Sequence, residues 1–314
     1  LAILLFAGEC PGFSNVRYVS MSFTNHRKMQ LYGALLLLPA ALLLTTFAYL
    51  PTVTTVINSL FLPGFRGAPT EFVGLENYQV LFDDPTFWKV ARNNLIYAVG
   101  TIPTSIALAL GMALFVNGKL RGRGFVRMAY FTPTILPMIA AANIWMFFYA
   151  PQIGLFNKLL GMLGFSGVNW LGDPSVALSS VIVMSVWKEA GFFMIFYLAA
   201  LQSMPPELKE AADLEGTSRW SFFWRVTFPL LMPTTLFVLI NALINSVRVV
   251  DHLFILTKGG PNNATNLLLY YVYENAFSFF DRTTAATITV VILLVLAVVA
   301  TLKFTILDRR THYQ

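Results

Sequence analysis

The segment SMPPELKEAADLEGTSRWSFFWRVTFPLLMP, residues 203–233, lies between two long apolar stretches and has the pattern of two short helices joined by a turn. A proline in the first turn of a helix loses no backbone hydrogen bond, because the N–H groups there have no partner within the helix. Acidic side chains are also favoured there, since the helix dipole is positive at that end. The proline pair at 205–206, followed by Glu207 and Glu210, therefore predicts a helix that continues through Leu214.

A turn and a second short helix are predicted to follow. Gly216 allows the chain to turn, and the hydroxyl of Thr217 or Ser218 can cap the next helix. The first helix then presents small alanines, and the second presents aromatic side chains. Two short helices with such surfaces suit docking into the groove of a partner protein.

The composition is that of a membrane protein. Apolar residues make up 57% of the 314 residues and charged residues only 11%, against about 45–50% and about 25% in a soluble domain. The formal net charge is +6, but the Lys and Arg residues are scattered in short clusters, so no binding of nucleic acid is expected. With one cysteine, Cys10, and no Cys/His cluster at zinc spacing, neither a disulfide nor a structural metal is expected.

Six stretches are apolar and long enough to cross a bilayer core about 30 Å thick, which takes about 20 residues per helix. Turn or charged segments bound each stretch. We therefore predict an all-α membrane protein with six transmembrane helices, in which Pro39, Pro103 and Pro137 kink their helices. The expected spans are Leu31–Ile57, Asn93–Val116, Met128–Ala150, Val176–Leu201, Leu230–Leu256 and Thr283–Leu307.

The orientation follows from the distribution of positive charge, because cytoplasmic loops are enriched in Lys and Arg. The N-terminal tail, the loops around Lys119 and Lys209, and the segment from Lys303 together carry 13 of the 21 Lys and Arg residues, whereas the three other loops carry 6. Both termini and the loop 203–229 are therefore predicted to be cytoplasmic.

The chain divides into a short N-terminal tail, 1–29, and a transmembrane domain, 30–314. Leu1–Ala7 is too short to span a membrane and has no basic residue before it, so it lacks the pattern of a signal peptide. We expect natural translation to begin near Met21, with the preceding residues as upstream sequence or tail.

Polar side chains interrupt the fifth span at helical spacing. A charge near the bilayer centre costs at least about 2.5–3.5 kcal/mol, so such side chains usually face a cavity or a partner. On one continuous helix they form a narrow stripe, which either lines a solute pathway or forms a polar seam against a partner helix. Asp251 follows Arg248 by three residues and can pair with it. The stripe consists of Thr234, Asn241, Asn245, Arg248 and His252.

Two adjacent charged residues, Lys188 and Glu189, lie near the middle of the fourth span, close to Gly191. Adjacent helical residues point about 100° apart, so the two cannot face the same partner. Either one faces the pathway and the other a neighbouring helix, or Gly191 marks a local helix break. The sequence leaves open whether Lys188 and Glu189 contact the solute or form structural pairs. The candidate pathway residues are Lys188, Glu189, Asn241, Asn245, Arg248, Asp251 and His252.

Catalytic residues and metal ligands are not expected. No Ser/His/Asp or Cys/His arrangement can be assembled from the sequence, and His252 has no second His or Cys near it in the chain. A phosphate-binding loop of the form Gly-x-x-x-x-Gly-Lys-[Ser/Thr] is also missing from the sequence. Any nucleotide chemistry is therefore expected on another polypeptide.

The loop between the fourth and fifth spans resembles a known motif. Glu210-Ala211-Ala212, three residues, Gly216, nine residues and Val226-Thr227-Phe228-Pro229 match the spacing of the EAA loop of ATP-binding-cassette (ABC) importer permeases. The family usually has Ile and Leu where this chain has Val226 and Phe228. The resemblance implies the type I ABC importer permease fold and a loop that couples to an ATPase subunit. The residues given this coupling role are Glu210, Ala211, Ala212, Asp213, Gly216 and Pro229.

A second resemblance narrows the family. The run Leu256–Pro261 and the C-terminal Arg309–Gln314 are similar to the carbohydrate-uptake branch, and to the first permease subunit of its maltose and glycerol-phosphate importers. This similarity implies alternating access for a sugar or sugar-like solute, which includes a polyol, glycerol phosphate or a sugar–glycerol conjugate.

The resemblance also implies partners and a location. They are a homologous second permease, two ATPase subunits that hold ATP and Mg²⁺, an extracytoplasmic solute-binding protein and the lipid of a bacterial cytoplasmic (inner) membrane. The alternative is an ion-coupled secondary transporter, in which charged residues within the spans handle the coupling ions. Such a carrier typically has inverted hydropathy repeats with paired broken helices, and the sequence shows no such pairing.

Overall fold

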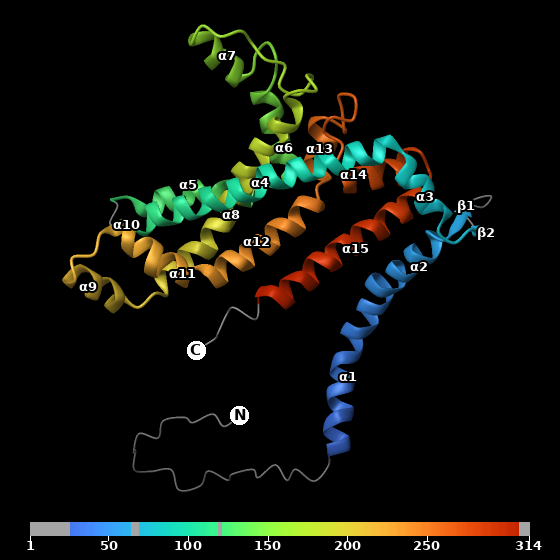
Figure 1. The fold of residues 1–314 in the computed structure, drawn as a ribbon, viewed down its shortest axis with the longest axis horizontal. Coiled ribbons are helices and arrows are strands. Elements are labelled where there is room, and N and C mark those ends of the chain that lie inside the picture. Colours follow the sequence, from blue (N-terminus) through green and yellow to red (C-terminus); the bar gives the residue numbers. More distant parts are fainter. Residues whose placement is uncertain (1–25, 64–68, 119–120, 308–314) are drawn as a thin grey trace, which may run out of the picture. The chain divides into compact units, whose positions relative to one another are not determined.

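The computed structural model describes residues 26–63, 69–118 and 121–307 (Figure 1). The predictions about Cys10, Met21 and the C-terminal run Arg309–Gln314 lie outside the described residues. The described part is mostly helical, as predicted. The chain falls into two units, 1–53 and 54–314.

The first unit carries a single helical stretch that continues into the second. It begins with α1 (His26–Leu44), passes through a π-helical turn (Thr45–Tyr49) and continues as α2 (Leu50–Asn58). The part from Tyr32 to Asn58 is 27 residues long and apolar enough to cross a membrane. The first predicted span is therefore a helix.

A small two-stranded sheet opens the second unit, which an all-α prediction did not include. β1 (Phe61–Pro63) pairs antiparallel with β2 (Pro69–Phe72), and Phe61 lies opposite Phe72. The two rings meet edge to face, with their centroids 5.4 Å apart. Such cross-strand aromatic pairs stabilise a short sheet. The chain then enters α3 (Glu76–Asp83).

Two long helices form the centre of the second unit. α4 (Pro85–Asn117) packs lengthwise against α8 (Ala177–Gln202), and each is long and apolar enough to span a membrane. The carboxylate of Asp84 caps α4 by accepting a hydrogen bond from the backbone N–H of Thr86, at 2.8 Å. The second and fourth predicted spans are therefore unbroken helices, and the break considered near Gly191 is not present.

Gly191 instead lets α8 approach α5 (Arg123–Ile135) closely. A Cβ atom at position 191 would lie 2.3 Å from the carbonyl oxygen of Tyr130 and 3.3 Å from Thr134 Oγ1. Only a residue without a side chain fits at that distance from a neighbouring backbone. The glycine therefore serves helix packing, as small residues do between membrane helices.

The third predicted span is not one helix. α5 and α6 (Met138–Phe148) meet at an angle of 103° across Leu136 and Pro137. Pro137 has no N–H to continue the helical bonding, and the residue before a proline is disfavoured in the helical conformation. Leu136 is accordingly extended, with φ −66° and ψ 133°. The expected kink at Pro137 is in fact a sharp break.

The fifth predicted span, Leu230–Leu256, is also not continuous. The stretch Arg219–Leu230 meets α12 (Met232–Val247) at 64°, and α12 ends at Val247. A separate helix, α13 (Asp251–Leu256), follows. Two β-branched residues precede Asp251, whose carboxylate suits the first turn of a new helix. The prediction of a single polar stripe was therefore wrong beyond Asn245.

The remaining helices connect these elements. Figure 1 shows α9 at one end of the second unit, called the α9 end below, and α6 with α13 well away from it, in a region called the α13 end. Buried apolar clusters lie toward each end, around Trp145 and Leu253 at the α13 end and around Tyr197 and Leu231 at the α9 end. The remaining elements are α7 (Leu155–Met162), α9 (Pro206–Leu214), α10 (Arg219–Phe222), a π-helical turn (Phe223–Thr227), α11 (Phe228–Leu230), α14 (Leu268–Tyr273), a π-helical turn (Glu274–Ser278) and α15 (Arg282–Leu307).

The number of membrane crossings is bounded by helix length and composition. Within the described residues, three helices can cross a membrane, or five if each bent pair counts as one crossing. α15 adds a shorter apolar segment, Arg282–Val298. The count of six spans and the location of the termini stay predictions.

Candidate functional site

The segment 203–233 forms the predicted pair of short helices at the α9 end (Figure 1). Gly216 has a φ of +68°, in the left-handed region. Its N–H donates to the carbonyl oxygen of Asp213 at 3.3 Å, and the N–H of Thr217 donates to that of Ala212 at 2.9 Å. These two bonds form a Schellman closure of α9, for which glycine is the least strained residue.

The second helix begins where Ser218 caps it. The hydroxyl oxygen of Ser218 accepts a hydrogen bond from the backbone N–H of Ser221, at 3.2 Å. α10 then continues without a gap through the π-helical turn into α11, which contains Pro229. The second helix is therefore longer than predicted.

The outer side of this turn carries charged and apolar side chains that no other part of the described chain covers. Glu210 and Asp213 are exposed. Leu214 is 90% exposed and Trp220 is 72% exposed. Large exposed apolar side chains beside charges are typical of a surface that another protein covers. We call Glu210, Asp213, Leu214, Gly216 and Trp220 the α9 surface.

The structure brings three of the predicted pathway residues together between helices. His252 of α13 is buried, and its Nε2 lies 3.2 Å from the hydroxyl of Ser185 on α8. Glu189, one turn further along α8, lies beside the amide of Asn245 on α12. These contacts join three helices through polar side chains in the apolar interior.

A tyrosine from a fourth helix completes this group. The buried Tyr97 of α4 lies beside Ser185 and Glu189, and its ring centroid is 6.4 Å from that of His252. We call Tyr97, Ser185, Glu189, Asn245 and His252 the polar cluster. Sequence reasoning missed Tyr97 and Ser185, because neither residue stands out in an apolar helix.

Lys188 lies outside the polar cluster. Its Nζ donates to the carbonyl oxygens of Pro133, at 3.0 Å, and Leu136, at 2.5 Å. In a continuous helix the Pro133 carbonyl would accept from residue 137, which is a proline without an N–H. Lys188 therefore satisfies carbonyl groups at the break between α5 and α6.

The other predicted pathway residues have separate surroundings. The Asn241 amide donates to the carbonyl oxygen of Phe237 in its own helix, at 2.8 Å. Arg248 is the exposed C-terminal cap of α12, and Asp251 is exposed in the first turn of α13. Because they lie on either side of a helix break, the argument for pairing at three-residue spacing on one helix does not apply.

A polar network that the sequence did not reveal fixes the loop 257–266 to the α13 end. The buried Asn93 of α4 donates from Nδ2 to the carbonyl oxygens of Asn263, at 2.7 Å, and Asn266, at 3.2 Å. The hydroxyl of Tyr271 donates to Asp84 Oδ2 at 3.0 Å, and burial raises the pKa of Tyr271 to about 12, so the donor stays protonated. The only sequence signal was the asparagine pairs at 93–94 and 262–263.

Comparison with known proteins now identifies the chain's family. Residues 101–313 match the model of the binding-protein-dependent transport system inner membrane component. The chain belongs to this family. It is 35% identical over 253 residues to the sulfoquinovosyl glycerol transport permease SmoG of Agrobacterium fabrum, covering 80% of this chain and 82% of that protein. It is 33% identical over 294 residues to the lactose transport permease LacF of Rhizobium radiobacter, covering 90% of this chain and 98% of that protein.

Solved structures agree on the fold. A bacterial ABC transporter for the acidic polysaccharide alginate matches with a TM-score of 0.78 at 24% identity, covering 92% of this chain and 98% of that one. The chain is therefore a multi-pass membrane permease subunit of an ABC importer, and it is not an enzyme. The alternative of an ion-coupled secondary transporter is set aside, because the family depends on a binding protein.

Across the described ranges, no three His, Cys, Asp or Glu residues gather closely enough to hold a metal ion. The polar cluster holds one histidine and one carboxylate among hydroxyl and amide groups. Its chemistry is that of hydrogen bonding, which suits a hydroxyl-rich ligand better than a cation.

Proposed function

We propose that this chain is one of two homologous permeases in an ATP-driven importer of a bacterial cytoplasmic membrane. The relatives named above carry a sugar–glycerol conjugate and lactose, and a trehalose/maltose permease MalF of Thermococcus litoralis is 34% identical over 269 residues. These names support a sugar or sugar-like solute. Six spans, with both termini in the cytoplasm, would place the α9 surface on the cytoplasmic side.

The α9 surface is the docking site for an ATPase subunit in this proposal. One observation carries it: a Schellman turn at Gly216 holds Leu214 and Trp220 exposed between two short helices. A rigid, partly apolar projection fits a groove on a partner. Two ATPase subunits, one for each permease, would hold ATP and Mg²⁺.

The connection between the α9 surface and the polar cluster is direct along the chain. α8 carries Glu189 and leads into α9, and α10–α11 lead into α12, which carries Asn245. The 13 residue steps from Glu189 to Gln202 make a helical path of about 20 Å. A movement of α9 would therefore act on both helices that meet at the cluster.

The polar cluster lines the solute pathway in this proposal. Its amide, carboxyl, imidazole and hydroxyl groups can exchange hydrogen bonds with sugar hydroxyls. Alternating access then requires a switch between two states, and reversing a 1:99 equilibrium to 99:1 takes about 5.5 kcal/mol of differential binding. ATP and a docked solute-binding protein would supply this together.

The coupling role is tested by co-purification. Glu210→Lys reverses a charge on the α9 surface, and Gly216→Pro removes both the positive φ and the N–H that bonds to Asp213. Both variants should lose the ATPase subunit from the purified complex. Glu76→Lys, a charge reversal at another exposed residue in the first turn of α3, is the control and should retain the ATPase subunit. Retention of the ATPase subunit by both test variants, in correctly folded chains, would contradict the proposal.

The pathway role is tested by uptake in vesicles. Glu189→Gln and Asn245→Ala should reduce solute uptake at least tenfold while the ATPase subunit still co-purifies. Asn143→Ala is the matched control, because the Asn143 amide bonds within its own helix α6, to the Ile139 carbonyl oxygen at 2.9 Å. If the two cluster variants lose the second permease instead, the cluster is a polar seam between subunits.

A further inference from the structure

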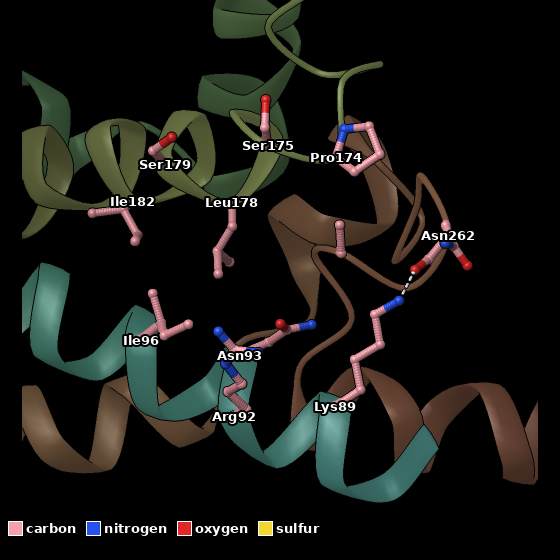
Figure 2. A pocket seen from close by; sticks show the side chains of 11 residues that line it. Lys89, Arg92, Asn93, Ile96, Pro174, Ser175, Leu178, Ser179, Ile182 and Asn262 are labelled. Carbon is pink, nitrogen blue, oxygen red and sulfur yellow. Dashed lines mark hydrogen bonds between the residues drawn. The ribbon is translucent and has the colours of Figure 1, made fainter. Parts of the chain in front are cut away.

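A pocket at the α13 end has no role in the functions proposed so far. It has a volume of about 450 Å³ and lies between the first part of α4, the start of α8 and the loop 257–266 (Figure 2). Figure 2 shows Lys89, Arg92 and Asn93 on α4 below the pocket and Ser175 and Leu178 above it. Its lining residues are Lys89, Arg92, Asn93, Ile96, Pro174, Ser175, Leu178, Ser179, Ile182, Asn262 and Ala264.

The charged residues that line the pocket are all positive. Its lining holds two cations, Lys89 and Arg92, and no acidic residue. Lys89 Nζ donates to the carbonyl oxygen of Asn262 at 2.6 Å, which satisfies one donor without cancelling the charge. The exposed Arg92 has no hydrogen-bond or ion-pair partner within the described residues.

The closest acidic residue along the chain is already engaged. Asp173 Oδ1 accepts hydrogen bonds from the backbone N–H of Ser175, at 2.9 Å, and from its hydroxyl, at 2.7 Å. These bonds lower the pKa of Asp173, so the carboxylate is ionised and held in its own loop. It does not line the pocket, so the positive charge faces an open space.

The walls of the pocket are fixed before any ligand arrives. Asn93 is 8% exposed and holds two carbonyl groups of the loop 257–266, as described above. Lys89 holds a third carbonyl of that loop. Because these bonds join α4 to a loop that is distant in sequence, the two cations are presented from a preformed frame, which reduces the entropy cost of binding.

We propose that this pocket is the docking site for an acidic side chain on the surface of the solute-binding protein. This inference rests on the proposed function: with the α9 surface on the cytoplasmic side, the α13 end would lie on the extracytoplasmic side. A pocket of about 450 Å³ admits side chains but is too small for a folded element. Complementary charge would speed association and select the partner's orientation.

The test measures ATP hydrolysis by the whole complex in lipid nanodiscs as the solute-loaded binding protein is titrated. Arg92→Glu should raise the half-saturating concentration of binding protein about tenfold, and the rate at saturation should approach that of the unmodified complex. Arg92→Lys keeps the charge and should restore most of the affinity. Lys158→Glu, an exposed reversal on α7 outside the pocket, should not move the curve.

Each other outcome has a distinct meaning. If Arg92→Glu and Lys89→Gln both leave the half-saturating concentration unchanged, the inference is overturned. It is also overturned if the shift appears only with an anionic solute and disappears with a neutral one, because the pocket then binds the solute. If the unmodified complex shows no stimulation by any binding protein, the proposed function itself has failed.

Discussion

Replacing Gly191 by alanine tests how closely α8 and α5 are packed. The added Cβ would lie 2.3 Å from the Tyr130 carbonyl oxygen, about 1 Å inside an ordinary contact. That oxygen belongs to the backbone, so no side-chain rotation relieves the overlap. The helices must move apart, and the change is expected to destabilise the protein although alanine is the better helix former.

Two opposing effects determine how much Gly191→Ala changes the unfolding free energy. Alanine in place of glycine within a helix is worth about 1 kcal/mol of stabilisation. Overpacking in a well-packed interior costs about 1–3 kcal/mol, and a clash with backbone belongs at the upper end of that range. Separation of the helices would also lengthen the two hydrogen bonds that Lys188 donates to the end of α5. A net loss of about 2 kcal/mol in unfolding free energy is expected.

The matched control is Gly111→Ala on α4. A Cβ atom at position 111 meets nothing within 4 Å, so this change should keep the full gain in helix propensity. The assay is the fraction of monodisperse complex that remains after heating in detergent. Gly191→Ala should lower the midpoint by several degrees and Gly191→Leu by more, while Gly111→Ala should leave it unchanged or raise it. Equal midpoints for Gly191→Ala and Gly111→Ala would show that α5 and α8 are not in close contact.

Three further changes have clear expected results. Lys188→Met should lower the thermal midpoint, because it leaves two carbonyl groups at the α5–α6 break without a charged donor. The expected loss of unfolding free energy is about 1.5–3 kcal/mol. An unchanged midpoint with lost uptake would give Lys188 a pathway role instead. Asn93→Ala removes the donor to two loop carbonyls and should cost about 1–3 kcal/mol, seen as faster hydrogen exchange in residues 257–266. A Cβ atom at position 216 would have no neighbour within 4 Å, so Gly216→Ala strains only the positive φ, at a cost of about 1–2 kcal/mol. Limited proteolysis at 206–218 should reveal the loosened turn. A cleavage rate equal to that of the unmodified chain would argue against the left-handed turn.

The helices of the α9 end were predictable because their signals are local. Pro206 starts α9, Gly216 closes it and Ser218 caps α10, and each acts within four residues along the chain. Backbone geometry of this kind depends little on the rest of the molecule. The same holds for the long apolar helices, whose hydropathy alone marks them.

The helix breaks were harder to predict because distant residues decide them. A proline indicates a kink, but the 103° turn at Pro137 also depends on Lys188, more than 50 residues away, which supplies hydrogen bonds to the freed carbonyls. The end of α12 at Val247 has only a weak local signal in two valines. A periodic pattern of polar residues cannot distinguish one long helix from two short ones.

The polar cluster was predicted only in part for a related reason. Hydropathy marks Glu189, Asn245 and His252 as unusual in an apolar helix, but it does not say what each one contacts. His252 meets Ser185 across 67 residues of sequence. Lys188 and Asn241 are equally unusual in sequence, yet each donates to a backbone carbonyl and lies apart from the cluster. The partner, and not the polarity, separates a structural residue from a pathway candidate.

The two kinds of partner give α8 two different faces. Lys188 and Gly191 hold α8 against the backbone of α5, while Ser185 and Glu189 meet side chains of α13 and α12. At 100° per residue these faces lie about 110° apart. A contact with fixed backbone resists sliding, whereas hydrogen bonds between side chains can exchange for bonds to a solute. We therefore expect α5 and α8 to move as one body, and the rearrangement that admits solute to occur where α8 meets α12 and α13.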